Sequence, residues 1–541
     1  MKAKPAAKKP THFLPRPQPL RLAVLSAMGL CGMLAAGQAN AYSCQYSPDQ
    51  ELAPGTSASY AYVICKGVDG VDEHSDDKPG GVGPDISTVS GALMSPHSST
   101  TLSPVLYGNP PGVYMAYSLG GAGVDEGAGG AGGTITMTNN GNVTLTAQPG
   151  NKAYFASLMS AISKGGAGDK LNDNNNSDGG DGGKGGDLYV TNKGPLTVSG
   201  SVASPGILGM SGIVATSTGA MGGDQNGSIF GDQVGGDGGA GGNITVSNQG
   251  SIDIGSPAGR MTGLAQGAGI QAGSSGGTGG TDNGNAGKAG WLDVRHSGDI
   301  NVLWSSTTGT PDSLVYSTSA LGVGVYGINA YSVGGMGSPT EDTSNDGGDG
   351  GSGLSVTLYA QGQIMVDVNG AVPVSGAGIA ARSVGGNGGM GPKSDHRGGD
   401  GGSSNGVWVV LENAGTRLTT VGNDLHGIMA QSLGGQGGPG RDGAALAGAG
   451  GGGGYGGDAN YVNVSTQSGT AIVTAGDYSS GLLAQSIGGG GGTGSDFVSV
   501  LGGQGGQGGN GGDGDEVTIS VGGDITTGGD HSYGVLAQSI A

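Results

Sequence analysis

Side chains that could do chemistry are few and widely spaced in this 541-residue chain. Beyond the first 41 residues the histidines are His74, His97, His296, His396, His426 and His531. No pair has the close spacing of a zinc site. No Gly-x-Ser-x-Gly nucleophile motif with matching His and Asp occurs in a recognisable frame. The sequence therefore predicts a protein without catalytic residues.

Carbohydrate chemistry on a parallel β-helix needs a groove with clustered carboxylates, Arg or Lys and aromatic platforms. The tryptophans are Trp291, Trp304 and Trp408, and the sequence places no such cluster around them. Trp408 lies in a Val-Trp-Val-Val-Leu run and is expected to pack on a strand face.

Calcium is the one cofactor with a sequence signal. Matches to the Gly-Gly-x-Gly-x-Asp core of calcium β-rolls begin at Gly182, Gly453 and Gly508. They occur singly, whereas a roll holds each ion between tandem copies. A second candidate is an acidic loop with Asp69, Asp72, Glu73, Asp76 and Asp77. We expect no cofactor, with calcium as the open alternative.

Residues 1–41 have the composition of a signal peptide. Six basic residues precede an uncharged apolar run from Leu22 to Ala36, and Ala39-Asn40-Ala41 supplies the small residues of a cleavage site. We expect cleavage between Ala41 and Tyr42, export through the inner membrane and no membrane span in the mature chain. Cleavage leaves 15 basic and 41 acidic residues, a formal net charge of −26, which disfavours nucleic acid as a partner.

Cys44 and Cys65 are the two cysteines of the mature chain. In an oxidising compartment an even pair predicts a disulfide, worth about 3 kcal/mol for a loop of this length. Two free buried thiols are the alternative. Both cysteines lie in residues 42–112, which do not fit the repeat and are expected to cap it.

A repeated motif organises residues 113–541. Its clearest copy is Gly481-Leu482-Leu483-Ala484-Gln485-Ser486-Ile487-Gly488-Gly489. The motif alanine recurs every 45 to 58 residues, at Ala116, Ala161, Ala215, Ala272, Ala330, Ala381, Ala430, Ala484 and Ala537. Repeats of about 50 residues indicate a stacked array.

Each repeat contains three short strands separated by glycine turns. Residues 517–521 alternate apolar and polar side chains, residues 525–527 follow after one turn, and residues 534–540 follow after another. This pattern predicts an all-β fold, a right-handed parallel β-helix. The motif alanine is expected to face inward and the variable residue after it outward. Gln485 and Gln538 are placed to hydrogen-bond between coils.

The remaining 25 to 30 residues of each repeat are rich in glycine, which provides 128 of the 541 residues. Residues 502–513 read Gly-Gly-x with a strict period of three. A polyproline-II-type helix also has three residues per turn, so these tracts could pack as a layer of polyglycine helices. Flexible loops are the alternative, favoured by the entropy cost of ordering glycine.

The signal peptide, the repeated Ala-Gln-Ser-Ile-Gly-Gly motif and the Val-x-Val strands resemble glycine-rich passenger regions of bacterial autotransporters (type V secretion). The resemblance covers residues 113–541 and is most specific at Ala430–Gly435 and Ala484–Gly489. It implies a Gram-negative β-helix at the cell surface (outer membrane) or secreted, non-enzymatic and structural or adhesive, with roles in adhesion, biofilm or virulence. The family carries a C-terminal translocator barrel, whereas this sequence ends inside a motif copy at Ala541.

The expected partners are host-cell, matrix or polysaccharide surfaces, or like copies on neighbouring cells. Two alternatives stay open. A carbohydrate-active β-helix enzyme would show Asp, Glu, Arg and aromatic residues clustered along one face. An ice- or crystal-binding protein would show flat, regular ladders of Thr or Asn.

Overall fold

The computed structural model describes residues 42–46, 61–67, 86–90, 112–124, 127–146, 155–169, 178–199, 209–224, 234–257, 259–263, 267–306, 324–340, 345–370, 375–392, 396–445, 449–499 and 504–541. The chain divides into Met1–Ala39 and Asn40–Ala541, and all described residues belong to the second unit. The expected signal peptide and the acidic loop lie outside the described residues. Among the described residues, no helix is long and apolar enough to cross a membrane.

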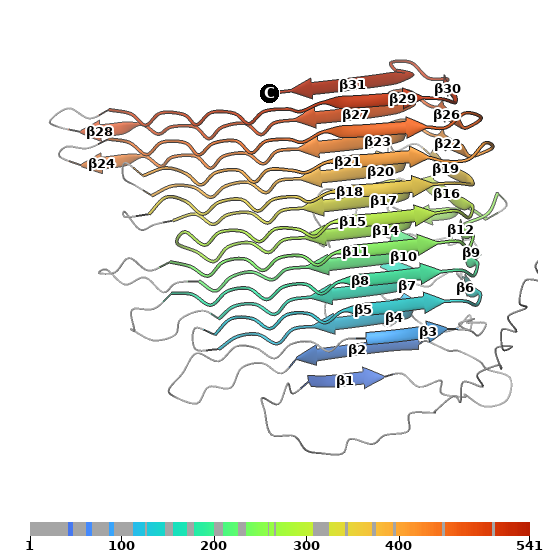
Figure 1. Cartoon of the computed structure of the whole chain (residues 1–541), viewed down its shortest axis with the longest axis horizontal. Coiled ribbons are helices and arrows are strands. Elements are labelled where there is room, and N and C mark those ends of the chain that lie inside the picture. The colour runs from blue at the N-terminus through green and yellow to red at the C-terminus, as the bar shows by residue number, and fades with distance from the viewer. Residues whose placement is uncertain are drawn as a thin grey trace, which may run out of the picture. The chain divides into compact units, whose positions relative to one another are not determined.

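The described part of Asn40–Ala541 is a parallel β-helix, as the repeat predicts. Its strands form three sheets of nine, nine and eleven strands among the described residues, and each sheet is built from strands of successive coils (Figure 1). We number the sheets in the order in which a coil passes through them.

Sheet 1 contains β3 (Ile86–Ser90), β5 (Ile135–Asn139), β8 (Leu188–Asn192), β11 (Ile244–Asn248), β15 (Leu292–His296), β18 (Val356–Ala360), β21 (Val407–Leu411), β25 (Val462–Thr466) and β29 (Val517–Val521). Sheet 2 contains β6 (Val143–Thr146), β9 (Leu196–Ser199), β12 (Ile252–Ile254), β16 (Ile300–Ser306) with β13 (Met261–Gly263) beside it, β19 (Gln363–Gly370), β22 (Arg417–Val421), β26 (Ala471–Ala475) and β30 (Asp524–Thr527). Sheet 3 contains β1 (Tyr42–Tyr46), β2 (Ala61–Gly67), β4 (Gly112–Leu119), β7 (Phe155–Lys164), β10 (Gly209–Thr218), β14 (Gly267–Ser275), β17 (Val325–Val333), β20 (Gly376–Val384), β23 (Leu425–Leu433), β27 (Leu482–Ile487) and β31 (Val535–Ile540). Strands β24 (Gly443–Ala445) and β28 (Phe497–Ser499) form a separate parallel pair.

The motif alanines lie in register through sheet 3. Ala430 pairs with Ala381 on one side and with Ala484 on the other, and the same pairing joins all nine copies. The alanines from Ala116 to Ala484 are fully buried. The inward position predicted for them is confirmed, including the copies whose surrounding sequence is least similar.

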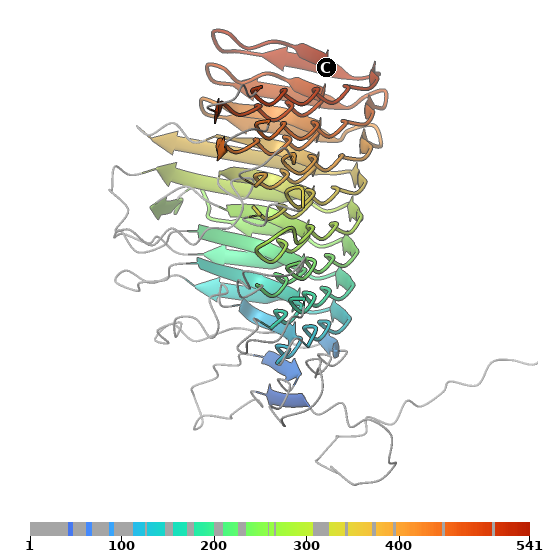
Figure 2. The same ribbon diagram turned by 90° about the vertical axis from the view of Figure 1, so that its left-hand side faces the viewer.

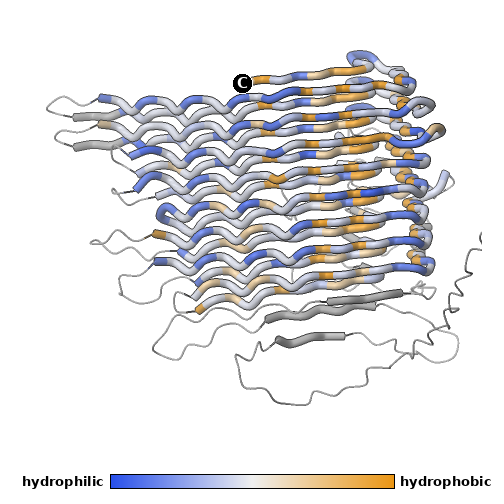
Figure 3. The backbone as a smooth tube through the Cα atoms, in the orientation of Figure 1, coloured by the Kyte–Doolittle hydropathy of each residue, from blue (hydrophilic) through white to orange (hydrophobic). Residues whose placement is uncertain are grey.

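The core is a set of apolar ladders between the three sheets. In β21, Val407, Val409 and Leu411 are fully buried, while Trp408 and Val410 between them face outward and are partly exposed. A side chain of this size contributes about 1.5–3 kcal/mol when it is fully buried. Figure 3 shows the apolar residues concentrated on the strands, with fewer of them along the glycine tracts.

The residue after each motif alanine was expected to face outward, and these residues lie outside the main core. Five of the nine are nevertheless buried, among them Tyr117 and Tyr331, which are 4% and 5% exposed. Towards the C-terminal coils the position holds glutamines that form the predicted amide ladder. Gln431 Nε2 donates to Gln485 Oε1 at 2.6 Å, and Gln485 Nε2 donates to Gln538 Oε1.

The glycine tracts form a packed layer beside the sheets, drawn as wavy segments on one side in Figure 1. In every coil an outgoing tract follows sheet 3 and a returning tract leads into sheet 1. Gly386 N–H donates to the Gly351 carbonyl and Gly402 N–H donates to the Gly386 carbonyl, both at 2.8 Å. Three residues along, Gly389 and Gly399 repeat the same pair of bonds at 2.8 Å. The period of three is that of a polyproline-II-type helix, so the layer, and not the loop alternative, describes these residues.

Close approach explains why two of every three residues are glycine. A Cβ at Gly386 would lie 1.6 Å from the Gly335 carbonyl oxygen, and one at Gly399 would lie 2.0 Å from that of Gly348. The third residue of each period points away from the neighbouring tracts, and polar or longer side chains are accommodated there. Figure 2 looks along the tracts and shows them stacked in two columns.

The motif serines join the sheets to the glycine layer. Ser274 Oγ donates to the Gly242 carbonyl at 2.8 Å and accepts from Gly290 N–H at 2.7 Å. Gly242 N–H in turn donates to Ser217 Oγ at 2.9 Å, and Ser332 Oγ donates to the Gly290 carbonyl at 2.9 Å. Serine hydroxyls and peptide groups therefore alternate along the stack and satisfy buried polar groups where each returning tract meets sheet 1.

Candidate functional site

The two columns of tracts give the glycine layer two chemically different surfaces. Each returning tract continues directly into a strand of sheet 1, so its third-position side chains and the outward side chains of sheet 1 form one surface, here called the returning face. Each outgoing tract continues from sheet 3, and its third-position side chains form the opposite surface, here called the outgoing face. The returning face carries most of the chemically reactive side chains of the layer.

Carboxylates stack along the returning face. Asp400 N–H donates to Asp349 Oδ1 at 2.8 Å, and Asp513 N–H donates to Asp458 Oδ1 at 2.9 Å. Burial raises the pKa of Asp349; the hydrogen bond from the Asp400 backbone opposes this shift, while the charges of Asp400 and Asp346 reinforce it. The ladder thus uses one oxygen of each carboxylate to hold the next coil.

An arginine partly balances this acidic row. Arg397 Nη2 lies 2.9 Å from Asp400 Oδ1, and its guanidinium lies 3.9 Å from the centre of the Tyr455 ring. A guanidinium over an aromatic face is an attractive cation–π contact. In the same coil, His396 Nδ1 lies 3.4 Å from Asp346 Oδ1.

Aromatic side chains gather where the returning face crosses sheet 1. Trp408 and Tyr461 meet edge to face with ring centroids 4.5 Å apart, and Trp408 lies on a strand face as expected. The Arg295 guanidinium lies 4.8 Å from the centre of the Tyr359 ring. The strand register makes Arg295 and Tyr359 direct neighbours although they are far apart in sequence.

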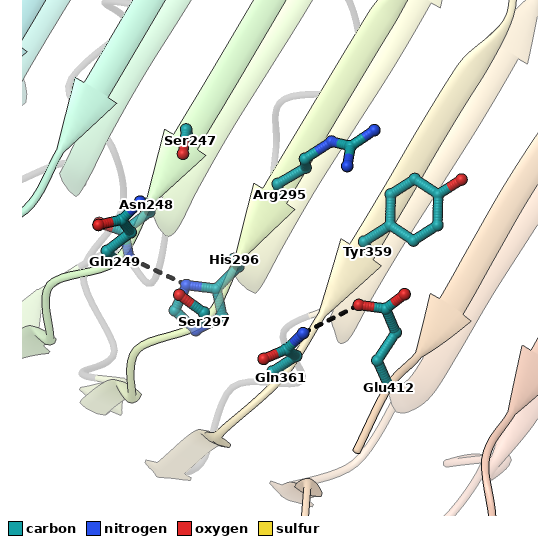
Figure 4. A pocket seen from close by; sticks show the side chains of 9 residues that line it. All are labelled: Ser247, Asn248, Gln249, Arg295, His296, Ser297, Tyr359, Gln361 and Glu412. Carbon is teal, nitrogen blue, oxygen red and sulfur yellow. Dashed lines mark hydrogen bonds between the residues drawn. The ribbon is translucent and has the colours of Figure 1, made fainter. Parts of the chain in front are cut away.

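A pocket of about 220 Å³ opens beside this cluster, at the turn between sheets 1 and 2 (Figure 4). Its lining residues are Ser247, Asn248, Gln249, Arg295, His296, Ser297, Tyr359, Gln361 and Glu412. Ser297 is the short turn residue between Gln249 and Gln361 in the adjoining coils, so a hollow is left between two longer side chains. On one wall Gln361 Nε2 donates to Glu412 Oε2 at 2.9 Å. The lining offers donors, acceptors, one cation, one carboxylate and an aromatic ring.

A buried amide ladder ends at this pocket. Asn139 Nδ2 donates to Asn192 Oδ1 and Asn192 Nδ2 to Asn248 Oδ1, both at 2.7 Å. Each amide nitrogen also donates to the carbonyl two residues ahead, as Asn248 does to Gly250 at 2.8 Å. Asn248 Nδ2 therefore donates to His296 Nδ1 at 2.9 Å, which assigns the proton of the neutral imidazole to Nε2.

His296 is held in its neutral form. Its side chain is buried, and burial lowers its pKa to about 4 against the opposing effects of Asp299 and the Gly298 carbonyl. Nε2 is enclosed and has no hydrogen-bond partner of normal geometry. His296 therefore ends the ladder as a desolvated donor, a costly arrangement in the core.

The structure describes only part of the two N-terminal sites that the sequence predicts, the disulfide and the signal cleavage site. The register pairs Cys44 with Cys65 on antiparallel β1 and β2, where opposite Cα atoms have the spacing that a disulfide needs. The side chains of both cysteines lie outside the described part, so the disulfide stays a prediction. Ala41 lies outside the described residues, and Tyr42 begins β1.

The three calcium-like matches lie in separate returning tracts. The aspartates that end two of them, Asp187 and Asp458, accept backbone N–H groups of the next coil at 2.8 and 2.9 Å. Among the residues that the structure describes, no group of three or more His, Cys, Asp or Glu is arranged to hold a metal ion. Calcium therefore stays an untested alternative to the expectation of no cofactor.

The cluster of Arg295, Tyr359 and Glu412 was not identified from the sequence. The available signal was the strand alignment, since residues 292–296 and 356–360 both begin an alternating apolar run after a glycine tract. Comparison with known protein families, with curated proteins and with solved structures found no match to this chain.

Proposed function

We propose that this chain is an exported, non-enzymatic passenger of the type V kind that attaches a Gram-negative cell to host-cell, matrix or polysaccharide surfaces through its returning face. The observation that carries the proposal is the alignment of Arg295, Tyr359 and Glu412 around one polar pocket. The Trp408–Tyr461 pair lies nearer the start of the strands of the same sheet. Aromatic rings beside mixed donors and acceptors suit a hydroxyl-rich ligand such as a sugar residue.

The stacked architecture supports attachment through many weak contacts. Neighbouring coils present their side chains in register, so an extended polymer can meet several coils at once. Linked weak contacts raise the overall affinity without any single tight site. The signal peptide expected at residues 1–41 supports export.

The pocket favours sugar binding over sugar cleavage. Most glycoside hydrolases use two carboxyl groups that flank the bond to be cleaved. Glu412 is the one carboxylate among the nine lining residues. An ice-binding surface needs the same residue type repeated from coil to coil. On the described outgoing face, the residues that stack in successive coils are as different as Met336, Asn387 and Gln436, which does not support that function.

A binding assay on polysaccharides and glycan panels tests the proposal. We expect the purified chain to bind at least one polysaccharide, and Tyr359→Ala or Trp408→Ala to weaken that binding. Met365→Ala, which removes an exposed side chain from sheet 2, is the matched control and should bind normally. Absence of binding to every probe, or binding that neither aromatic substitution alters, would contradict it.

Export is tested separately. Residues 1–41 fused to a periplasmic reporter should direct the reporter across the inner membrane. A reporter that stays in the cytoplasm would contradict the exported location.

A further inference from the structure

The first three rows of the outgoing face carry no charge over five consecutive coils; the next position along the tracts holds Asp442 and Asp496, where Asp496 N–H donates to Asp442 Oδ1 at 2.9 Å. These three rows are aligned by hydrogen bonds such as Gly385 N–H to the Leu433 carbonyl, Gly388 N–H to that of Gln436 and Gly391 N–H to that of Pro439, at 2.8 to 2.9 Å. From the coil of Ser275 to that of Ile487, the fifteen residues in these rows are Ser, Thr, Val, Met, Pro, Asn, Leu, Gln, Ile and Gly. None of the fifteen carries a charge, in a chain whose formal net charge is −20.

The opposite surface has the contrary composition. The equivalent positions of the returning tracts over the same coils include Lys288, Asp349, Asp400, Asp458, Asp513 and Glu516. The two surfaces of the glycine layer, which is only two tracts thick, therefore differ in charge over these rows.

The outgoing face also exposes methionine side chains. Met336 is 55% exposed and Met390 is 37% exposed. Methionine adapts its shape easily and is common at binding surfaces. Exposed apolar patches mark interaction sites in soluble proteins, and these methionines supply the most exposed large apolar side chains of the three rows.

The distribution of charge on the chain favours a second copy of it as the partner of this surface. Two copies of an acidic chain repel each other through most of their surfaces, and repulsion is weakest where the contacting surfaces carry no charge. A two-fold contact brings the same patch of both copies together. Three rows about 9 Å apart and five coils about 4.8 Å apart cover roughly 700 Å², close to the about 800 Å² per partner of a standard interface.

We propose that a second copy of this chain docks on the outgoing face, with the two glycine layers back to back. The two returning faces then point outward on opposite sides of the pair. This inference concerns a different surface from the proposed attachment function and does not depend on it.

Isosteric charge variants test the contact. Asn387→Asp with Gln436→Glu adds two negative charges to the outgoing face, and an aspartate at 387 can still accept the Gln436 N–H as Asn387 does at 2.9 Å. Asn285→Asp with Asn510→Asp adds the same charge to the returning face, where an aspartate at 285 keeps the acceptor for Asp349 N–H at 3.0 Å. Sedimentation equilibrium compares their self-association with that of the unaltered chain.

The proposal predicts that the outgoing-face pair raises the dimer dissociation constant at least about tenfold, because like charges would oppose each other across the contact. The returning-face pair should leave it within about twofold once the ionic strength screens distant charges. A monomer at concentrations up to about 100 μM, or equal weakening by both pairs, would overturn the proposal.

Oxidation footprinting gives an independent reading without substitutions. Met390 and Met365 are 37% and 38% exposed, and Met365 lies on sheet 2, away from the outgoing face. On concentration from the monomeric to the dimeric range, peroxide oxidation of Met336 and Met390 should slow while that of Met365 does not. Equal oxidation of all three at every concentration would also overturn the proposal.

Discussion

Adjacent glycines in one outgoing tract are expected to respond oppositely to alanine. A Cβ at Gly489 would lie 1.8 Å from the Gly435 carbonyl oxygen, well inside the 3.0 Å that Cβ atoms keep from other heavy atoms. A Cβ at Gly490 would meet no atom within 4 Å. The row of Gly490 already holds alanine at Ala122 and Ala167 in other coils.

The magnitude follows from the contacts that must move. Gly489 N–H donates to the Gly457 carbonyl and Gly512 N–H donates to the Gly489 carbonyl, both at 2.8 Å. Displacing this backbone by more than 1 Å weakens both bonds, each worth about 0.5–1.5 kcal/mol, and adds overpacking strain of about 1–3 kcal/mol. Gly489→Ala should therefore cost about 2–6 kcal/mol.

Gly490→Ala should instead be neutral or stabilise by up to about 1 kcal/mol, because alanine restricts the unfolded chain. The Gly490 backbone is not in the left-handed region, so alanine is accommodated without strain. Urea unfolding of the two variants and the unaltered chain measures the difference. Hydrogen exchange at the same coil reports the local cost, since stacked arrays unfold through coupling between neighbours. Equal effects of the two substitutions would refute the packed layer and favour flexible loops.

Three further substitutions or measurements follow from the structure. His296→Asn should continue the amide ladder and remove a pH dependence of stability. Burial lowers the folded pKa of His296 to about 4, below its unfolded value near 6.5. The free energy of unfolding of the unaltered chain therefore has its full value above pH 6.5 and falls by about 3 kcal/mol as the pH drops to about 4. Unfolding free energies of both chains at about pH 7 and pH 4.5 check this, and parallel pH profiles would contradict it. Ser274→Ala leaves Gly290 N–H and the Gly242 carbonyl without their partner and should cost about 1–3 kcal/mol by thermal or urea unfolding. The control Ser465→Ala, at an outward position of sheet 1, should change the stability little. Equal costs would count against the role of the motif serines in joining the sheets to the glycine layer. Non-reducing peptide mapping of the exported chain should find Cys44 and Cys65 cross-linked, as their antiparallel register allows, and two separately alkylated thiols would refute the disulfide.

The stacking order was predictable because the motif alanine recurs once in every repeat, and it is fully buried from Ala116 to Ala484. Its spacing therefore fixed the coil register even where neighbouring residues diverge, as at Ala161 and Ala272. The period of three in the glycine tracts similarly predicted a helix, because two of its three edges must be bare for tracts to pack. From the sequence, the conformational entropy cost of ordering glycine left the loop alternative open. The hydrogen bonds between tracts offset this cost, and they are visible only in the structure.

The pocket was not predictable in the same way. Arg295 and Tyr359 become neighbours only through the pairing of two strands separated by a long tract, and the tract lengths vary from coil to coil. The hollow at Ser297 depends on the length of the side chains one coil below and one coil above it. The amide ladder did carry a signal, since Asn139, Asn192 and Asn248 each end an alternating strand in the same position.

Hydrogen exchange of the glycine tracts tests the central claim most directly, because the two opposed faces exist only if the tracts are packed. The account predicts that the amides of Gly386, Gly389, Gly399 and Gly402, all of which donate to neighbouring tracts, exchange at least about 100-fold more slowly than in an unstructured chain. Protection should match that of the sheet 3 amides in the same coils. Exchange of these four glycines at the rate of an unstructured chain, with the sheets protected, would contradict the packed layer and both surfaces built on it.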